Sequence, residues 1–182
     1  ILEIGAGTGQ LAALFLKEGA KCVIVDLPGM HAKAQYFLYK CAGLRVGTYA
    51  HYLNLNRDLK KTLEFFDVVF LPPWEKENIH EPFDLAINTR SLSEMDFQEA
   101  HAYLNLIQKT SRYFFCLNTN KKGWDGVTQY NYKEHSSLEY QKVLNMELMI
   151  SGTSLSDTLF LKIPHYVYGV YKNPGPDSRS NL

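Results

Sequence analysis

The chain opens with a short apolar segment that leads directly into a glycine-rich loop. Residues 1–4 precede Gly5, Gly7 and Gly9, and Glu3 stands two positions before the first of these glycines. A strand that turns sharply into a helix while its backbone passes close to a ligand requires glycines, because Cβ atoms would obstruct the ligand. The loop therefore predicts a site for a nucleotide-type cofactor, and a tight turn without a ligand is the alternative.

The spacing of the glycines indicates which nucleotide is bound. The dinucleotide fingerprint requires a third glycine at position 10, where this chain has Gln10, so a nicotinamide-dependent oxidoreductase is disfavoured. An acidic residue followed by glycines at the observed spacing resembles motif I of the class I S-adenosylmethionine-dependent methyltransferases. The resemblance implies S-adenosylmethionine as the cofactor, with its carboxylate facing backbone amides at the start of the next helix. The loop residues implied to bind it are Glu3, Gly5, Ala6, Gly7 and Gly9.

A second acidic residue follows the next apolar run. Asp26 comes directly after residues 21–25 and 17 residues after Gly9. A carboxylate at the end of a second strand can accept hydrogen bonds from both ribose hydroxyls, so Asp26 and the adjacent Leu27 are expected to bind the cofactor. An Asp before Pro28 also fits a turn or a helix cap, and these roles are compatible.

The adenine ring is expected against the end of a third strand, residues 67–71, which two prolines stop. The acidic residue that typically reads adenine is missing from this position. Leu71, Pro72 and Trp74 are therefore expected to supply an apolar or stacking surface. Packing of the Trp74 ring on the flank of the core is the alternative.

A further segment narrows the family. Residues 88–95, Asn-Thr-Arg-Ser-Leu-Ser-Glu-Met, together with Val-Asp-Leu-Pro at 25–28 and Phe-Leu-Pro-Pro-Trp at 70–74, resemble the bacterial sugar O-methyltransferases. The resemblance extends from residue 1 to about Asn118. It implies methyl transfer to a hydroxyl of a sugar or glycan precursor. A non-sugar small-molecule acceptor and a non-catalytic, cofactor-binding module are the alternatives.

Methyl transfer from a sulfonium is an in-line displacement, so most of the acceleration comes from holding the acceptor oxygen against the methyl group. A sugar hydroxyl is a poor nucleophile, and a carboxylate or imidazole that accepts its proton would help. Glu94 is the first candidate for this base, although Ser91 and Glu94 also match a capping box that opens the next helix. His31 is the second candidate, and a surface histidine at a helix start is its alternative.

Polar residues follow two further strands, at the end where open α/β sheets bind ligands. Asn88 and Thr89 are expected to contact the cofactor, and Arg90 to hold a hydroxyl or carboxylate of the acceptor. Asn118 and Trp124 are expected to bind the acceptor, with the Trp124 ring stacked on the sugar. Asn118 and Trp124 are each equally compatible with ordinary loop chemistry.

The elements that would position these residues alternate between strand and helix. This order predicts an α/β fold with a Rossmann-like, doubly wound, mostly parallel sheet. An antiparallel closing strand is expected as in class I methyltransferases. Strands are expected at residues 1–4, 21–25, 67–71, 83–88, 113–117, 147–150 and 165–171. Helices are expected near residues 30–41, 56–66 and 97–111, and directly behind the glycine loop, and residues 44–53 are left unassigned.

Smaller features complete the predicted organisation. The first helix is expected to bury Leu11, Leu14, Phe15 and Leu16 and to end at Gly19. The helix expected at 56–66 should turn Leu59, Leu63 and Phe66 inward. Tyr166 and Tyr168 recur at strand spacing, which favours one face of a sheet over a binding site.

Composition limits the functional classes. The 182 residues fit one domain: 1–172 is expected to form an N-terminally truncated methyltransferase domain and 173–182 a disordered tail. The 19 basic and 19 acidic residues cancel, which disfavours a nucleic-acid partner. No apolar run reaches the roughly 20 residues of a membrane span, so a cytoplasmic location is expected. The three cysteines lack the close pairing of a zinc site, and no metal is expected.

Overall fold

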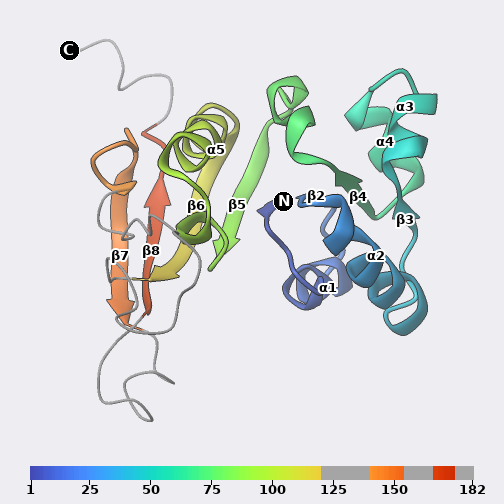
Figure 1. Ribbon diagram of the computed structural model, residues 1–182, viewed down its shortest axis with the longest axis horizontal. Coiled ribbons are helices and arrows are strands. Elements are labelled where there is room, and N and C mark those ends of the chain that lie inside the picture. The colour runs from blue at the N-terminus through green and yellow to red at the C-terminus, as the bar shows by residue number, and fades with distance from the viewer. Residues whose placement is uncertain (120–139, 154–165, 175–182) are drawn as a thin grey trace. The chain divides into compact units, whose positions relative to one another are not determined.

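The computed structural model describes residues 1–119, 140–153 and 166–174. The chain divides into two units, Ile1–Phe83 and Asp84–Leu182, and each is described by itself (Figure 1). None of the helices in the described ranges is long and apolar enough to cross a membrane.

The first unit is built on four parallel strands. They lie in the order β3 (Val46–Gly47), β4 (Val68–Leu71), β2 (Cys22–Val25) and β1 (Leu2–Ile4). Every residue of β1, β2 and β4 is buried. β2 and β4 are apolar at every position, and β1 is apolar except for Glu3. Such runs are typical of parallel strands that are covered on both faces, and the strands predicted at 1–4, 21–25 and 67–71 are confirmed.

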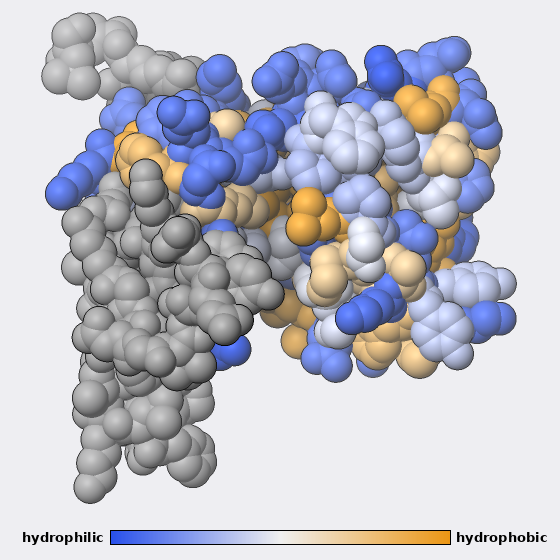
Figure 2. Space-filling model, viewed as in Figure 1, coloured by the Kyte–Doolittle hydropathy of each residue, from blue (hydrophilic) through white to orange (hydrophobic). Residues whose placement is uncertain are grey.

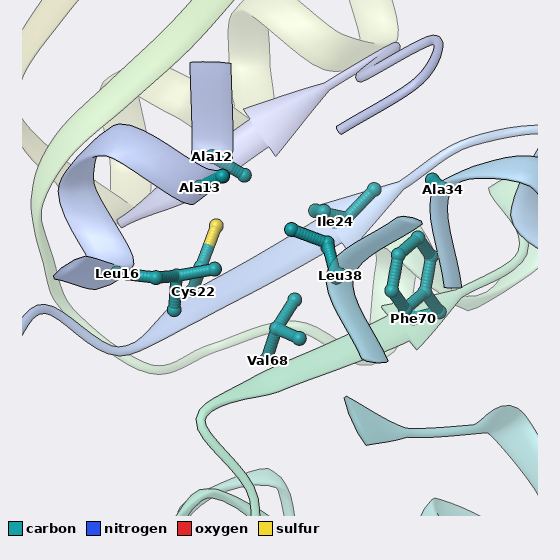
Figure 3. Packing of buried hydrophobic residues seen from close by; sticks show 9 residues of the cluster. All are labelled: Ala12, Ala13, Leu16, Cys22, Ile24, Ala34, Leu38, Val68 and Phe70. Atoms are coloured by element: carbon teal, nitrogen blue, oxygen red, sulfur yellow. The ribbon is translucent and has the colours of Figure 1, made fainter. Parts of the chain in front are cut away.

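Helices connect these strands. They are α1 (Gln10–Lys17), α2 (Pro28–Tyr36) with its π-helical continuation Phe37–Cys41, α3 (Tyr49–Asn54), α4 (Leu59–Phe65) and a 3₁₀ helix, Pro73–Asn78. Figure 3 shows Leu16 of α1, and Ala34 and Leu38 of the α2 segment, pointing towards Cys22 and Ile24 of β2. This cluster is the hydrophobic core of the unit.

The prediction for the buried face of α1 is partly wrong. Leu16 is buried as expected, but Leu14 is 62% exposed, and the other buried side chains are Ala12 and Ala13. At 100° per residue, Leu14 lies about 200° away from Leu16 and so faces away from the sheet. The predicted end of the helix is confirmed, because Gly19 follows the last turn with a φ of 85°.

The unassigned segment 44–53 contains β3 and most of α3. Thr48 caps α3, with its side chain accepting from the His51 amide. The helix predicted at 56–66 begins later, at Leu59, because Asn56 and Arg57 have positive φ angles and Asp58 is the N-cap. Leu59 is buried as expected; Leu63 and Phe66 are only half-buried, and Thr62 is the other buried residue of α4.

The second unit contains β5 (Phe83–Thr89), α5 (Phe97–Thr110), β6 (Ser111–Thr119), β7 (Glu147–Thr153) and β8 (Tyr166–Lys172). Its strands lie in the order β5-β6-β8-β7. β8 is antiparallel to both β6 and β7, which confirms the antiparallel closing strand. Asn173, expected in the tail, donates its side-chain amide to the Gln108 carbonyl at 2.7 Å, and residues 175–182 lie outside the described part.

The alternative interpretation of Ser91 and Glu94 as a capping box is wrong. Ser91 precedes a short 3₁₀ helix, Leu92–Glu94, and Glu94 is its last residue. The Ser91 side chain makes no capping bond. α5 begins three residues later, where the Asp96 carboxylate accepts from the Glu99 amide at 2.8 Å. Glu94 therefore does not serve as a helix cap, and its side chain is exposed.

Candidate functional site

The glycine loop adopts a conformation that other residues rarely take. Gly5, Gly7 and Gly9 have φ angles of 70°, 58° and 77°, in the left-handed region that only glycine enters without strain. A Cβ on Gly9 would also lie 3.2 Å from Leu38 Cδ1. The loop connects β1 to α1 as predicted, and the glycines meet a backbone requirement that exists without any ligand.

Asp26 ties this loop to the end of β2. Its Oδ2 accepts from the Gly7 amide at 3.1 Å, and its Oδ1 accepts from the Leu27 amide at 2.7 Å. An ionised carboxylate has about four acceptor positions, so each oxygen retains capacity for a hydroxyl donor. Leu27 is exposed beside it.

Glu3 is an acidic side chain enclosed in the core of the first unit. It is 1% exposed, and its Oε2 has no hydrogen-bond partner among the described residues. Burial, followed by the nearby charge of Asp26, raises the pKa of Glu3 to about 7. A buried, unpartnered carboxyl oxygen is unusual and calls for an explanation. A cationic group of a ligand would satisfy it.

His31 lies in the first turn of α2 and is 8% exposed. The surface alternative is therefore wrong. Its Nε2 has no hydrogen-bond partner in the described ranges, and its ring meets Phe70 edge-on at 5.2 Å. Burial lowers the pKa of His31, against the opposing charge of Asp26. The imidazole is thus neutral at neutral pH and able to accept a proton.

An aromatic group follows the end of β4. Trp74 is 60% exposed, so it does not pack on the core flank. Its Nε1 donates to the Tyr49 hydroxyl at 3.4 Å, and the two rings meet edge-on at 6.2 Å. The Tyr49 hydroxyl in turn donates to Oε1 of the buried Glu75 at 2.6 Å. The side chains of Leu71 and Pro72 are buried, so only their backbone atoms are available to a ligand.

Sequence reasoning missed Tyr49 and Glu75. Tyr49 lies in the segment that had been left unassigned, and its partner is 26 residues away. The capping pattern at Thr48 was the one signal that could have placed Tyr49 at the start of a helix.

In the second unit, two asparagines hold the turn that follows β5. Asn88 and Asn118 are fully buried. Asn118 Nδ2 donates to Asn88 Oδ1 at 2.7 Å, and Asn118 Oδ1 accepts from the Ser93 amide at 3.2 Å. Asn88 Nδ2 donates to the Ser91 hydroxyl. Both asparagines are expected from the sequence to contact ligands, and in the described part of the chain these bonds join them to each other and to the turn.

Arg90 lies at the centre of this turn. It has a φ of 72°, and its guanidinium carbon lies 4.4 Å above the centre of the Tyr166 ring. The prediction that Tyr166 lies in a sheet is confirmed, because it begins β8, opposite Thr119 of β6. Thr89 is half-buried at the end of β5.

The remaining candidates are Trp124, a metal site and the cysteine thiols. Trp124 lies outside the described residues. Among residues 1–119, 140–153 and 166–174, no group of three or more His, Cys, Asp or Glu side chains is arranged to hold a metal ion. Cys22 and Cys116 are buried, and burial raises the pKa of the Cys116 thiol to about 12. These thiols are not placed to act as nucleophiles.

Solved structures share this fold. The methyltransferase domain of bacterial CtHen1 matches with a TM-score of 0.58 over 94% of this chain and 88% of that chain, at 14% identity. An O-methyltransferase family protein from Burkholderia thailandensis matches with a TM-score of 0.60 at 16% identity, over 96% of this chain and 51% of that chain. The [4+2]-cyclase SpnF matches with a TM-score of 0.60 at 14% identity, over 95% of this chain and 74% of that chain.

No model of a known protein family and no curated protein sequence matches the chain. The structural similarities nevertheless confirm the predicted fold class, which is Rossmann-like α/β with a mostly parallel sheet and an antiparallel closing strand, as in class I methyltransferases. Methyltransferases and a cyclase share this fold, so the chemistry has to be argued from the side chains of the site.

Proposed function

We propose that the chain binds S-adenosylmethionine and transfers its methyl group to a hydroxyl of a sugar or glycan precursor. The observation that carries the cofactor assignment is the unpartnered carboxyl oxygen of the buried Glu3, in the strand that leads into a loop of three left-handed glycines. This combination fits a ligand with both an ammonium group and a nucleoside. The glycines alone would fit many nucleotides.

Each part of the cofactor has a proposed receptor in the first unit. Glu3 receives the ammonium group, and the amides of Ala6 to Gly9 at the start of α1 receive the carboxylate. The Asp26 oxygens accept hydrogen bonds from the ribose hydroxyls, at the acceptor positions that the Gly7 and Leu27 amides do not occupy. The exposed ring of Trp74, oriented by Tyr49, gives the adenine a stacking surface.

The cofactor supplies an electrophilic methyl group on a sulfonium. The chain has to hold the acceptor hydroxyl in line with that group and to take its proton. Glu94, an exposed carboxylate after the Asn88 turn, is the first candidate for the base. His31, which is neutral at neutral pH, is the second. The sugar acceptor rests on the resemblance of segments 25–28, 70–74 and 88–95 to sugar O-methyltransferases.

A second candidate function is a cofactor-binding module that catalyses no methyl transfer. SpnF has a similar structure and is described as a [4+2]-cyclase, which names a reaction other than methyl transfer. This similarity favours the second candidate. Methylation of a non-sugar small molecule is the third candidate, since nothing in the first unit selects the acceptor.

Calorimetric titration with S-adenosylmethionine tests the cofactor assignment. Asp26→Asn should weaken binding about tenfold to hundredfold, the equivalent of one or two charge-assisted hydrogen bonds. Asp84→Asn is the matched control, because Asp84 is an exposed aspartate on β5. Absence of binding to the wild-type chain, or equal loss in both variants, contradicts the assignment.

Transfer of labelled methyl groups to a panel of sugars and phenols then tests the reaction. Methylated sugar products that depend on Glu94 or His31 support the proposal. Binding of the cofactor without any methylated product favours the module, and products formed only from phenols favour a non-sugar acceptor.

A further inference from the structure

Arg90 has a backbone conformation that its side chain does not favour. A φ of 72° is accessible to glycine without strain, but an L-residue with a Cβ is strained there. Both backbone polar groups of Arg90 are held: its amide donates to the Leu117 carbonyl at 2.7 Å, and its carbonyl accepts from the Ser93 hydroxyl at 3.1 Å. Such strain persists only where the surrounding structure enforces it, and it is concentrated at functional sites.

The support beneath Arg90 is buried and polar. The Asn88 and Asn118 amides bind one another, and together they accept from the backbone amides of Leu92 and Ser93. A buried amide network of this kind orders the backbone above it, since each lost bond would leave a buried polar group unsatisfied. The turn is therefore rigid enough to hold one side chain in a defined place.

The guanidinium itself is exposed and has no carboxylate partner in the part of the chain that the structure describes. Arg45 and Arg57, by contrast, pair with Asp67 and Glu75. The guanidinium carbon of Arg90 lies over the Tyr166 ring, 4.4 Å from its centre. A cation–π contact occupies no oxygen acceptor, and the guanidinium has five N–H donors that can bind a planar or tetrahedral oxyanion.

We propose that Arg90, held over the Tyr166 ring, binds an anionic oxygen group of the methyl acceptor, either a carboxylate or a phosphate. The turn follows the carboxyl end of β5, which is the end at which open α/β sheets bind their ligands. The inference rests on the proposed function and narrows it. The acceptor is an acidic sugar, a hexuronate or a sugar phosphate, and not a neutral sugar.

A purely structural function of Arg90 makes a different prediction. If the contact with Tyr166 served only to hold the start of β8, Arg90→Gly would lower the melting temperature. Because glycine relieves the strain at a φ of 72°, we expect Arg90→Gly to melt at the same temperature as the wild type or above it, while losing the oxyanion site.

The test compares three probes at constant ionic strength: glucuronate, glucose 6-phosphate and neutral glucose. Dissociation constants are measured by calorimetry for the wild type, Arg90→Gln and the control Arg112→Gln. Arg112 is an exposed arginine near the other end of β6, and it also lies over a tyrosine, 5.3 Å from the Tyr113 ring centre. Both substitutions remove one charge, so general electrostatic effects are matched.

We expect the wild type to bind glucuronate or glucose 6-phosphate at least about tenfold more tightly than glucose. Arg90→Gln should abolish this preference, and Arg112→Gln should keep it. Preference for glucuronate identifies a carboxylate acceptor, and preference for glucose 6-phosphate a phosphorylated one. Equal binding of all three probes, or a preference that survives Arg90→Gln, overturns the inference.

Binding of S-adenosylmethionine by the same preparations separates the two proposals. If the chain binds the cofactor but shows no Arg90-dependent preference for the anionic probes, the proposed function still holds and the proposal of an acidic acceptor is wrong. An Arg90-dependent preference without cofactor binding removes the methyltransferase assignment and leaves the oxyanion site.

Discussion

Replacement of Glu3 by glutamine should remove a pH-dependent loss of stability from the first unit. Glutamine has nearly the same shape as a protonated glutamate and carries no charge. The pKa of Glu3 in the folded chain is raised from an ordinary value of 4.5 to about 7, because burial and the charge of Asp26 disfavour the ionised form. The protonated side chain therefore contributes stability fully below pH 4.5, and that contribution is lost as the pH rises through about 7.

The magnitude follows from the two pKa values. The difference between 4.5 and about 7 corresponds to a loss of about 3 kcal/mol of unfolding free energy in the wild type on going from low to high pH. Glu3→Gln does not titrate and should not show this loss. For a chain of this length, about 3 kcal/mol corresponds to about 6–12 °C in melting temperature.

The assay is thermal unfolding, followed by far-ultraviolet circular dichroism at pH 4.5 and pH 8. Glu3→Gln and wild type should melt at similar temperatures at the lower pH, and the variant should melt clearly above the wild type at the higher. Glu18→Gln is the control, because Glu18 is an exposed glutamate at the end of α1. Parallel pH profiles for wild type and Glu3→Gln would refute the reasoning.

The same group links stability to the proposed cofactor. An ammonium group beside Glu3 favours the ionised carboxylate, so binding near pH 6 should release a proton and Glu3→Gln should bind more weakly. Calorimetry in two buffers of different ionisation enthalpy measures the released proton. Tighter binding by Glu3→Gln would contradict an ammonium contact.

Three further predictions concern the loop, the turn and the core. Gly9→Ala should destabilise the chain by about 1–2 kcal/mol, because Gly9 has a φ of 77° and a Cβ there would lie 3.2 Å from Leu38; an unchanged denaturation midpoint would contradict this. Asn118→Ala should cost about 1–3 kcal/mol, since it leaves the Ser93 amide unpaired, and hydrogen exchange of that amide should accelerate. Leu16→Ala should cost about 2–5 kcal/mol and Leu14→Ala less than about 0.5 kcal/mol, because only Leu16 is buried; similar losses in chemical denaturation would contradict the assigned face of α1.

Local features of the fold could be predicted from the sequence because they depend on single residues or short runs. The left-handed loop could be identified because positive φ angles at Gly5, Gly7 and Gly9 are a property of glycine itself. The buried parallel strands could be identified because a run such as Cys22–Val25 is apolar at every position. The end of α1 at Gly19 is a local property of the same kind.

Competing local signals could not be resolved in this way. Residues 11–16 are all apolar, so the pattern placed Leu14 on the buried face together with Leu16. Packing against Leu38 and β2 instead buries Ala12, Ala13 and Leu16. The sequence offered a capping box at Ser91 and Glu94 as the start of the next helix, whereas α5 begins after Asp96. The Ser91 hydroxyl accepts from the Asn88 amide and makes no capping bond, and the Asp96 carboxylate caps the helix.

The sequence by itself determined the order of the strands and helices except β3 and α3, and it determined the glycine loop and the acidic residues that flank it. These features follow from conformational preference and hydrophobic pattern over a few neighbouring positions. The tertiary structure decided what surrounds each of these residues. Burial left Glu3 without a hydrogen-bond partner on its Oε2, and Tyr49 meets Trp74 across 25 residues of chain. Tyr166 reaches Arg90 only because β8 pairs with β6. Contacts between residues so far apart depend on how the strands pair, and no local pattern carries that information.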